Sequence, residues 1–92
     1  MRLDSAELMI RKASWMLDSG LPCGAEATMA KWLAADACFF AADRAMQTHG
    51  GFGYASEYHV ERYWREARLQ KIAPISQEMI QNYVAEHVLE LP

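Results

Sequence analysis

A glycine-rich segment, His49-Gly50-Gly51-Phe52-Gly53-Tyr54, is the part of this chain whose residue types could most readily perform chemistry. Glycine has no Cβ, so backbone N–H groups in such a segment can approach a phosphate or a ring closely. The segment follows a helical pattern rather than a strand, which fits neither a P-loop nor a dinucleotide-binding βαβ unit. A helix C-cap followed by a turn would explain the same glycines. Composition alone therefore favours a structural turn over a ligand loop.

A basic series follows the glycine segment at a spacing of three and could bind phosphates: Arg62, Arg65, Arg68 and Lys71. Glutamates are interleaved with these cations. Glu61–Arg65 and Arg62–Glu66 are spaced i,i+4, which is the spacing of ion pairs on one helix face. We therefore expect a salt-bridged helix surface here rather than an anion site.

The remaining reactive side chains predict neither a metal site nor a nucleophile. His49, His59 and His87 lack the Glu-x-x-His pairs of di-iron helical bundles. No serine has the sequence context of a nucleophile elbow. Cys23 and Cys38 form no CxxC pair, and we expect two reduced thiols, with Cys38 inside a core. A disulfide between them is the alternative.

The bulk composition indicates a small soluble protein. Apolar residues make up 52% of the 92 residues, which is too many for a disordered segment. The formal net charge is −3, and no stretch is basic enough to suggest nucleic-acid binding. No apolar run approaches the roughly 20 residues that span a bilayer, and the N-terminus lacks a signal-peptide pattern. These features predict a cytoplasmic protein without nucleic-acid or membrane partners.

Hydrophobic periodicity predicts an all-α protein, an up-and-down helical bundle without strands or internal repeats. Four helices are expected, at residues 5–19, 25–48, 57–71 and 76–89. Asp4 is the predicted N-cap of the first helix, with Glu7 completing a capping box. Gly20 and Pro22 are expected to end that helix.

The second predicted helix is the longest and would extend roughly 36 Å. Small residues dominate one stripe along it: Ala30, Leu33, Ala34, Ala37, Ala41 and Ala45. Only Lys31 and Asp36 are charged between positions 31 and 42. A helix that is apolar nearly all round is normally buried on most sides, and three other short helices cannot cover this one. We therefore expect a homo-oligomer, or further domains, to cover it.

Residues 45–68 resemble the signature near the C-terminus of the FAD-dependent acyl-CoA dehydrogenases. The family pattern is roughly Gln-x-x-Gly-Gly-x-Gly-Tyr, then Glu-Arg, then Arg-Asp-x-Arg. Similar residues here are Gln47 to Tyr54, Glu57, Val60-Glu61-Arg62 and Arg65-Glu66-Ala67-Arg68, with Lys31 in an alanine-rich helix upstream. The resemblance extends over nearly the whole chain but covers only the last part of a usual family chain. It implies that residues 1–92 are a single helical domain or fragment, without the N-terminal helical and middle β domains.

The resemblance also implies part of a C-terminal four-helix bundle that is built around FAD and packs into dimers and tetramers. By motif position, Gln47, Gly50 and Gly51 would approach the FAD of a neighbouring subunit. Ser76 and Glu78 occupy the positions of a Thr and a later polar residue that also contact FAD, at a helix N-terminus suited to a pyrophosphate. FAD is therefore the implied cofactor, although the isolated chain need not bind it. Gly51→Val is expected to damage cofactor binding or folding, because the loop needs either positive φ or close backbone approach.

The family reaction removes an α-proton from an acyl-CoA with a carboxylate base, while a β-hydride passes to the flavin. In many members the base is the Glu of a Glu-Gly-Thr segment. This sequence reads Ile72-Ala73-Pro74-Ile75-Ser76, so Pro74 falls at that position and no catalytic residue is assigned. The base could lie on an earlier helix outside these residues, the chemistry could be altered, or catalysis could be lost. Glu78 is expected to cap the helix or contact cofactor rather than replace the base.

Two functions from different classes remain open. The first is the C-terminal segment of an acyl-CoA dehydrogenase, which would act on an acyl-CoA only together with the missing domains. The second is a non-catalytic helical oligomerisation module of the same fold. A stand-alone nucleotide or CoA binder is a weaker third possibility.

Overall fold

The computed structural model describes all 92 residues and contains only helices, turns and loops. It has four α-helices and one 3₁₀ turn: α1 Arg2–Asp18, α2 Gly24–His49, η1 Gly50–Tyr54, α3 Val60–Leu69 and α4 Gln77–His87. The predicted all-α class is confirmed, and each predicted helix coincides with an observed one. No helix is both long enough and apolar enough to cross a membrane.

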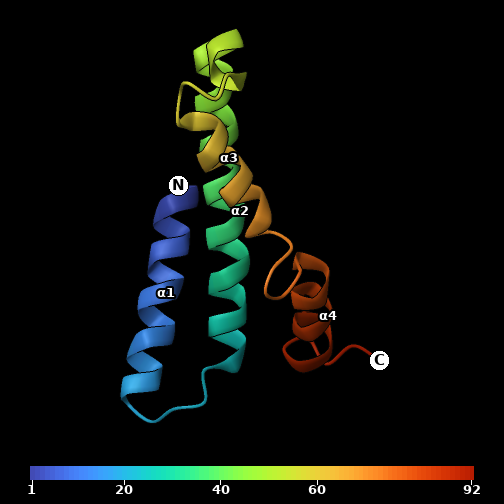
Figure 1. The fold of residues 1–92 in the computed structure, drawn as a ribbon. Coiled ribbons are helices and arrows are strands. Elements are labelled where there is room, and N and C mark those ends of the chain that lie inside the picture. The colour runs from blue at the N-terminus through green and yellow to red at the C-terminus, as the bar shows by residue number, and fades with distance from the viewer.

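The longest helix, α2, is the centre of the fold. Its 26 residues extend about 39 Å. Every other element contacts it, whereas α1 contacts neither α3 nor α4, and α3 does not contact α4. Figure 1 shows α1 antiparallel to α2, α3 running back along the C-terminal half of α2, and α4 beside its N-terminal half. The N-terminal half of α2 therefore has α1 and α4 beside it, whereas α3 packs on its C-terminal half.

Alanine makes most of the core. Seven apolar residues are buried: Ala6, Ala30, Ala35, Ala37, Val60, Ala67 and Ile80. Five of them are alanines, so neighbouring helices approach α2 closely over small side chains. No large side chain is completely buried. The core is consequently thin for a chain of this length.

The molecule is elongated and exposes much apolar surface. Its radius of gyration is 15.7 Å, whereas a compact domain of this length would have about 12 Å. Its accessible surface is 6821 Å², against about 5,400 Å² for a folded monomer of this mass. Even on α2, the central helix, Cys38, Phe40 and Ala41 are exposed. The expected incomplete coverage of this helix is therefore present.

Two local predictions for α1 and α2 are wrong. Helix α1 begins at Arg2 without a side-chain cap, so Asp4 lies within the first turn instead of capping it. There the terminal ammonium, 2.9 Å away, hydrogen-bonds the Asp4 carboxylate and holds its pKa below the usual value. Glu7 pairs with Arg11 at 2.6 Å rather than completing a capping box. Cys38 is exposed rather than in a core, because no helix covers that side of α2.

The predicted ion pairs of α3 are also absent. Neither Glu61–Arg65 nor Arg62–Glu66 is among the salt bridges of the structure. The guanidinium of Arg62 lies instead over the Tyr63 ring, 5.5 Å from its centroid. A spacing of four residues permits such a pair, but solvated side chains gain little from forming it.

Polar side chains link the outer helices to α2. Lys12 Nζ of α1 lies 3.1 Å from the Glu26 carboxylate, and this hydrogen bond lowers the pKa of Glu26. Trp64 Nε1 of α3 donates to Asp43 Oδ1 at 3.0 Å. These contacts add directional bonds to helix pairs that also pack through apolar side chains, such as Phe39 of α2 against Trp64 of α3.

We expect Ala37→Leu to lower the free energy of unfolding by about 1–3 kcal/mol, because three additional carbon atoms would have to fit at a close helix contact. Ala37 is only 2% exposed. Denaturant unfolding followed by circular dichroism measures the effect. The matched control is Ala41→Leu, at an exposed position of the same helix, which should change stability by no more than about 0.5 kcal/mol. Equal losses in both variants would contradict close packing at Ala37.

Candidate functional site

The C-terminus of α2 turns sharply at Gly50. This residue has φ 60° and ψ −140°, and its N–H donates to the carbonyl of Gln47. A positive φ is readily available only to glycine, so the turn itself requires a glycine here. The chain then continues directly into η1.

Gly53 is needed for a different reason, close approach. A Cβ at this position would lie 2.6 Å from the Met46 carbonyl oxygen and 3.0 Å from the His49 Cβ. Real Cβ atoms do not come so near a backbone oxygen, so only glycine allows η1 to fold back on the end of α2. Gly53 is accordingly buried.

Gly51 meets neither requirement. Its φ is not positive, and a Cβ there would meet no atom within 4 Å. The loop does contain both expected features, a positive φ at Gly50 and a close approach at Gly53, but neither lies at Gly51 within this chain. The backbone at Gly51 is exposed, as is the side chain of Gln47, which makes no hydrogen bond within the chain. Gln47, Gly50 and Gly51 thus form one accessible group at the end of α2.

Aromatic rings support this group from one side. Phe52 and Tyr58 have ring centroids 5.6 Å apart, and His49 meets the same tyrosine edge-on at 6.1 Å. Aromatic pairs in such tilted geometries stabilise a contact beyond the area that they bury. They hold residues 55–59 against the turn and leave the Gly50–Gly51 backbone uncovered.

A second group of predicted site residues lies at the start of α4. Ser76 has extended backbone angles, and its Oγ accepts a hydrogen bond from the Met79 N–H at 3.3 Å, so Ser76 is the N-cap. Its hydroxyl hydrogen remains free to donate. Glu78, expected to cap the helix or contact cofactor, is not the cap. It lies exposed in the first turn, where the helix dipole favours a carboxylate.

The structure does not bring these two groups together. Gln77, next to Ser76, donates to the carbonyl of Trp32 at 3.5 Å. Gln47 lies further along the same helix, and the rise from Trp32 to Gln47 is about 22 Å. One chain therefore presents two separate groups, Gln47–Gly50–Gly51 and Ser76–Glu78, at different levels of α2.

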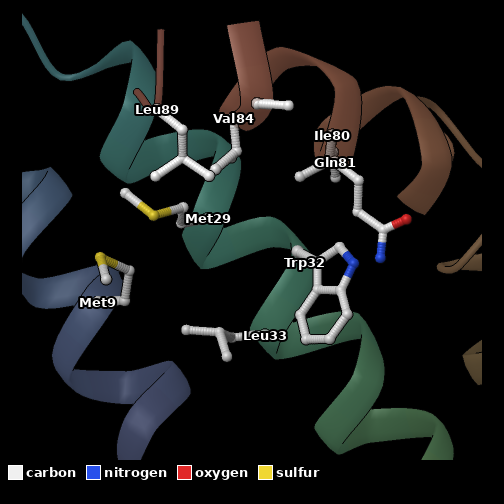
Figure 2. A pocket seen from close by; sticks show the side chains of 9 residues that line it. Met9, Met29, Trp32, Leu33, Ile80, Gln81, Val84 and Leu89 are labelled. Carbon is white, nitrogen blue, oxygen red and sulfur yellow. The ribbon is translucent and has the colours of Figure 1, made fainter. Parts of the chain in front are cut away.

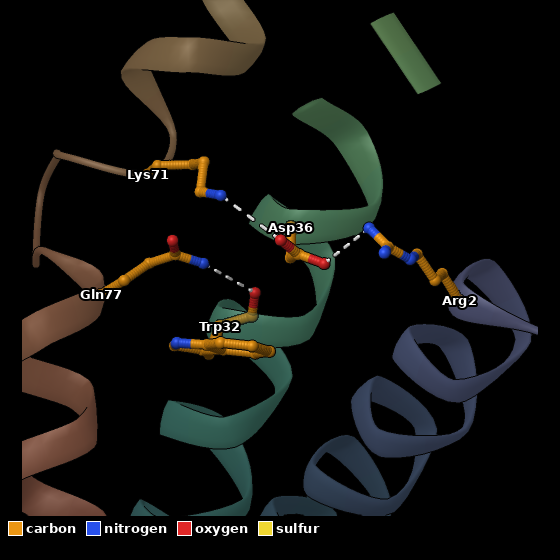
Figure 3. A network of polar contacts seen from close by, with 5 residues as sticks. All are labelled: Arg2, Trp32, Asp36, Lys71 and Gln77. Atoms are coloured by element: carbon orange, nitrogen blue, oxygen red, sulfur yellow. Dashed lines mark hydrogen bonds and ion pairs between the residues drawn. The ribbon is translucent and has the colours of Figure 1, made fainter. Parts of the chain in front are cut away.

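The connection before α4 contains features that the sequence did not predict. Lys71 Nζ lies 3.3 Å from Asp36 Oδ1, and Arg2 pairs with the other oxygen of that carboxylate at 3.1 Å (Figure 3). Lys31 Nζ donates to the carbonyl of Gln70. One sequence feature could have pointed to these contacts: Lys31 and Asp36 are the only charged residues in the most apolar part of α2. Pro74 lies exposed within this connection and has no group that could accept a proton.

An apolar groove lies between α1, α2 and α4 (Figure 2). Its volume is about 320 Å³, and eight of its nine lining residues are hydrophobic, among them Met9, Met29, Leu33 and Val84. The indole Nε1 of Trp32, another lining residue, is buried and has no hydrogen-bond partner. Unsatisfied buried N–H groups are rare in complete structures. The groove therefore has the chemistry of an interior surface that this chain leaves uncovered.

Comparison with known proteins identifies relatives over nearly the whole chain. Residues 1–89 match the family model described as "Acyl-CoA dehydrogenase, C-terminal domain". The acyl-CoA dehydrogenase FadE12 of Mycobacterium tuberculosis is 46% identical over 92 residues, which cover 98% of this chain and 24% of that protein. A 3-(aryl)acrylate reductase of Clostridium sporogenes is 34% identical over 89 residues, again 24% of its length.

Solved structures agree with this assignment. The butyryl-CoA dehydrogenase of Megasphaera elsdenii superposes with a TM-score of 0.90 at 29% identity, covering 97% of this chain and 23% of that chain. The chain thus spans about a quarter of the length of the relatives that it matches. From the match over residues 1–89 and the geometry of its motif, the chain belongs to the acyl-CoA dehydrogenase family, within the part known as its C-terminal domain.

Proposed function

We propose that these residues are the C-terminal part of a flavin-dependent acyl-CoA dehydrogenase and that they act only together with further polypeptide. The complete enzyme would oxidise the α–β bond of an acyl-CoA thioester, in fatty acid metabolism. The observation that carries the proposal is Gly51, an exposed glycine in the family motif that the packing of this chain does not require. A ligand pressed against the Gly51 backbone would require it.

The two groups of site residues fit the polar parts of FAD. The Gln47 amide and the exposed backbone of the glycine turn can hydrogen-bond phosphate or ribose oxygens, and the Ser76 hydroxyl can donate to them. When bound, the flavin supplies the acceptor for the hydride. The five residues include no cation, so they do not by themselves balance the charge of the pyrophosphate.

The separation of the two groups supports a site shared between subunits. We assign Ser76 and Glu78 to the flavin of their own subunit, and Gln47, Gly50 and Gly51 to the flavin of a neighbour. With about 22 Å between their levels on α2, each group would serve a different flavin. Each flavin site would then be incomplete without a second copy of the chain, which makes the functional unit a homo-oligomer.

The apolar groove supports the need for further polypeptide within each subunit. Helices α1 and α4 both pack on α2 without touching each other, and the groove between them has a nearly continuous apolar lining. An apolar helix seated there would complete a four-helix cross-section and bury the uncovered side chains.

The catalytic base must lie outside these residues if the enzyme is active. Pro74 stands where many family members have the glutamate, and the connection from Ile72 to Ser76 contains no carboxylate. We propose a carboxylate on the completing polypeptide, with the Ile72–Ser76 connection as a wall of the site. Two free thiols, Cys23 and Cys38, support the cytoplasm as the compartment.

We expect FAD to remain bound after gel filtration when the chain is mixed with the remaining polypeptide of FadE12, outside the matched 24% of that relative. The chain alone should lose the cofactor, because it carries only part of each site. Adding acyl-CoA of increasing chain length should bleach the flavin absorbance of the assembled sample. Assembly with bound FAD but no bleaching by any acyl-CoA would contradict the dehydrogenase function.

Gly51→Ala is expected to leave the melting temperature of the chain unchanged and to lower FAD affinity in the assembly about tenfold, because the added methyl group occupies space open to a ligand. Gly53→Ala is the matched control. It should lower the melting temperature by several degrees, because its Cβ meets the Met46 carbonyl at 2.6 Å. Thermal unfolding and flavin fluorescence titration measure the two effects. Unchanged FAD affinity in Gly51→Ala would remove Gly51 from the site.

A second function, a non-catalytic oligomerisation module, is favoured by Pro74 together with the exposed apolar surface. In that case the chain should self-associate without flavin, which sedimentation equilibrium would detect as a concentration-dependent mass. Exposed apolar side chains include Leu8, Trp15, Phe40 and Leu69, and burying them drives association. A folded monomer at all concentrations would contradict this alternative.

A further inference from the structure

The connection between α3 and α4 is fastened to α2 at both ends (Figure 3). At its start, Lys31 Nζ donates to the Gln70 carbonyl and Lys71 Nζ pairs with Asp36 at 3.3 Å. At its end, Gln77 Nε2 donates to the Trp32 carbonyl at 3.5 Å. The three contacts on α2 lie within about one and a half turns of that helix.

The backbone of the connection closes on itself as well. The N–H of Gln77 donates to the carbonyl of Lys71 at 3.2 Å, and the N–H groups of Ile72 and Ala73 both donate to Leu69 at 2.9 Å. Gln77 is the first residue of α4. The Lys71 carbonyl therefore holds the first N–H of α4, directly after the N-cap Ser76.

These contacts are partly withdrawn from solvent. The side chains of Lys71 and Asp36 are 23% and 29% exposed, and Gln77 is the buried polar side chain of the core. The Lys71 ammonium also lies over the Phe39 ring, 5.3 Å from its centroid. Because α3 and α4 do not contact each other, the start of α4 is held by the connection and by the contacts with α2.

We propose that Asp36, acting through Lys71, is a positioning residue for the flavin-contacting start of α4. The carboxylate holds Lys71, the Lys71 carbonyl holds the Gln77 N–H, and this fixes Ser76 and Glu78 on either side of Gln77. Asp36 itself touches neither of these two residues. The proposal rests on the proposed function, in which Ser76 and Glu78 contact FAD.

Asp36 has two cationic partners, and they provide a matched pair of variants. Lys71 belongs to the connection, whereas Arg2 belongs to α1 and reaches the same carboxylate at 3.1 Å. Lys71→Met removes the ion pair between Asp36 and the connection. Arg2→Met removes the other ion pair of Asp36, which joins it to α1 and does not involve the connection. Lys71→Arg should restore the contact. At Asp36 itself, Asp36→Asn is compared with Asp43→Asn, whose carboxylate bonds Trp64 of α3 instead.

Hydrogen exchange in the 92-residue chain, followed by NMR at the Ala73 and Gln77 amides, tests the fastening. Lys71→Met and Asp36→Asn should speed exchange there about threefold to fivefold, the upper range for a partly exposed ion pair. Arg2→Met, Asp43→Asn and Lys71→Arg should leave these two amides near the wild-type rate. Unchanged exchange in Lys71→Met, or equal acceleration in Arg2→Met, would contradict the claim that the Asp36–Lys71 ion pair restrains the start of α4.

FAD affinity in the assembly with the remaining FadE12 polypeptide tests the positioning role. Lys71→Met should weaken FAD binding about threefold and Arg2→Met should not, whereas a merely structural role would make FAD affinity follow overall stability in both. Wild-type affinity in Lys71→Met despite faster exchange would overturn the positioning role. A wild-type assembly that binds no FAD would overturn the proposed function and not the fastening, which the exchange rates report by themselves.

Discussion

The close packing of other helices on α2 over alanine side chains is the interaction on which the rest of this structure depends. Ala30 and Ala37 of α2, and Ala6 of α1, are buried where larger residues would force the helices apart. Small side chains bring backbones together but bury little area each, so the chain gains limited hydrophobic stabilisation for its length. Thin packing and exposed apolar surface are two consequences of the same composition.

A single central helix also decides where functional groups can lie. Gln47 is near the C-terminus of α2, whereas Ser76 starts a helix that packs on the N-terminal half, so one chain holds the two groups apart. The three motif glycines have three different surroundings: Gly50 makes the turn, Gly53 allows close approach, and Gly51 faces open space. Of the three, only Gly51 has no need within this chain to be glycine, so a reason for it would have to come from contact with a group outside the chain.

The carboxylate of Asp36 is a charged group in an otherwise apolar part of the fold. Asp36, in the most apolar part of α2, joins Arg2 of α1 to Lys71 of the connection before α4. A charge in such a place is costly unless it is paired, so its two partners are tied to it. The same carboxylate thus links both α1 and the connection before α4 to α2.

The sequence by itself determined the helical class, the approximate helix bounds and the family, because periodicity, breakers and a spaced motif are local properties. It also indicated that the three other helices would not cover α2, since the sequence shows apolar residues on nearly all sides of that helix. Only the tertiary structure decided which glycine meets the Met46 carbonyl, that Ser76 rather than Glu78 caps α4, and that Cys38 is exposed. Those outcomes depend on which helices meet and at what level, and no local pattern records the distance between segments far apart in the chain.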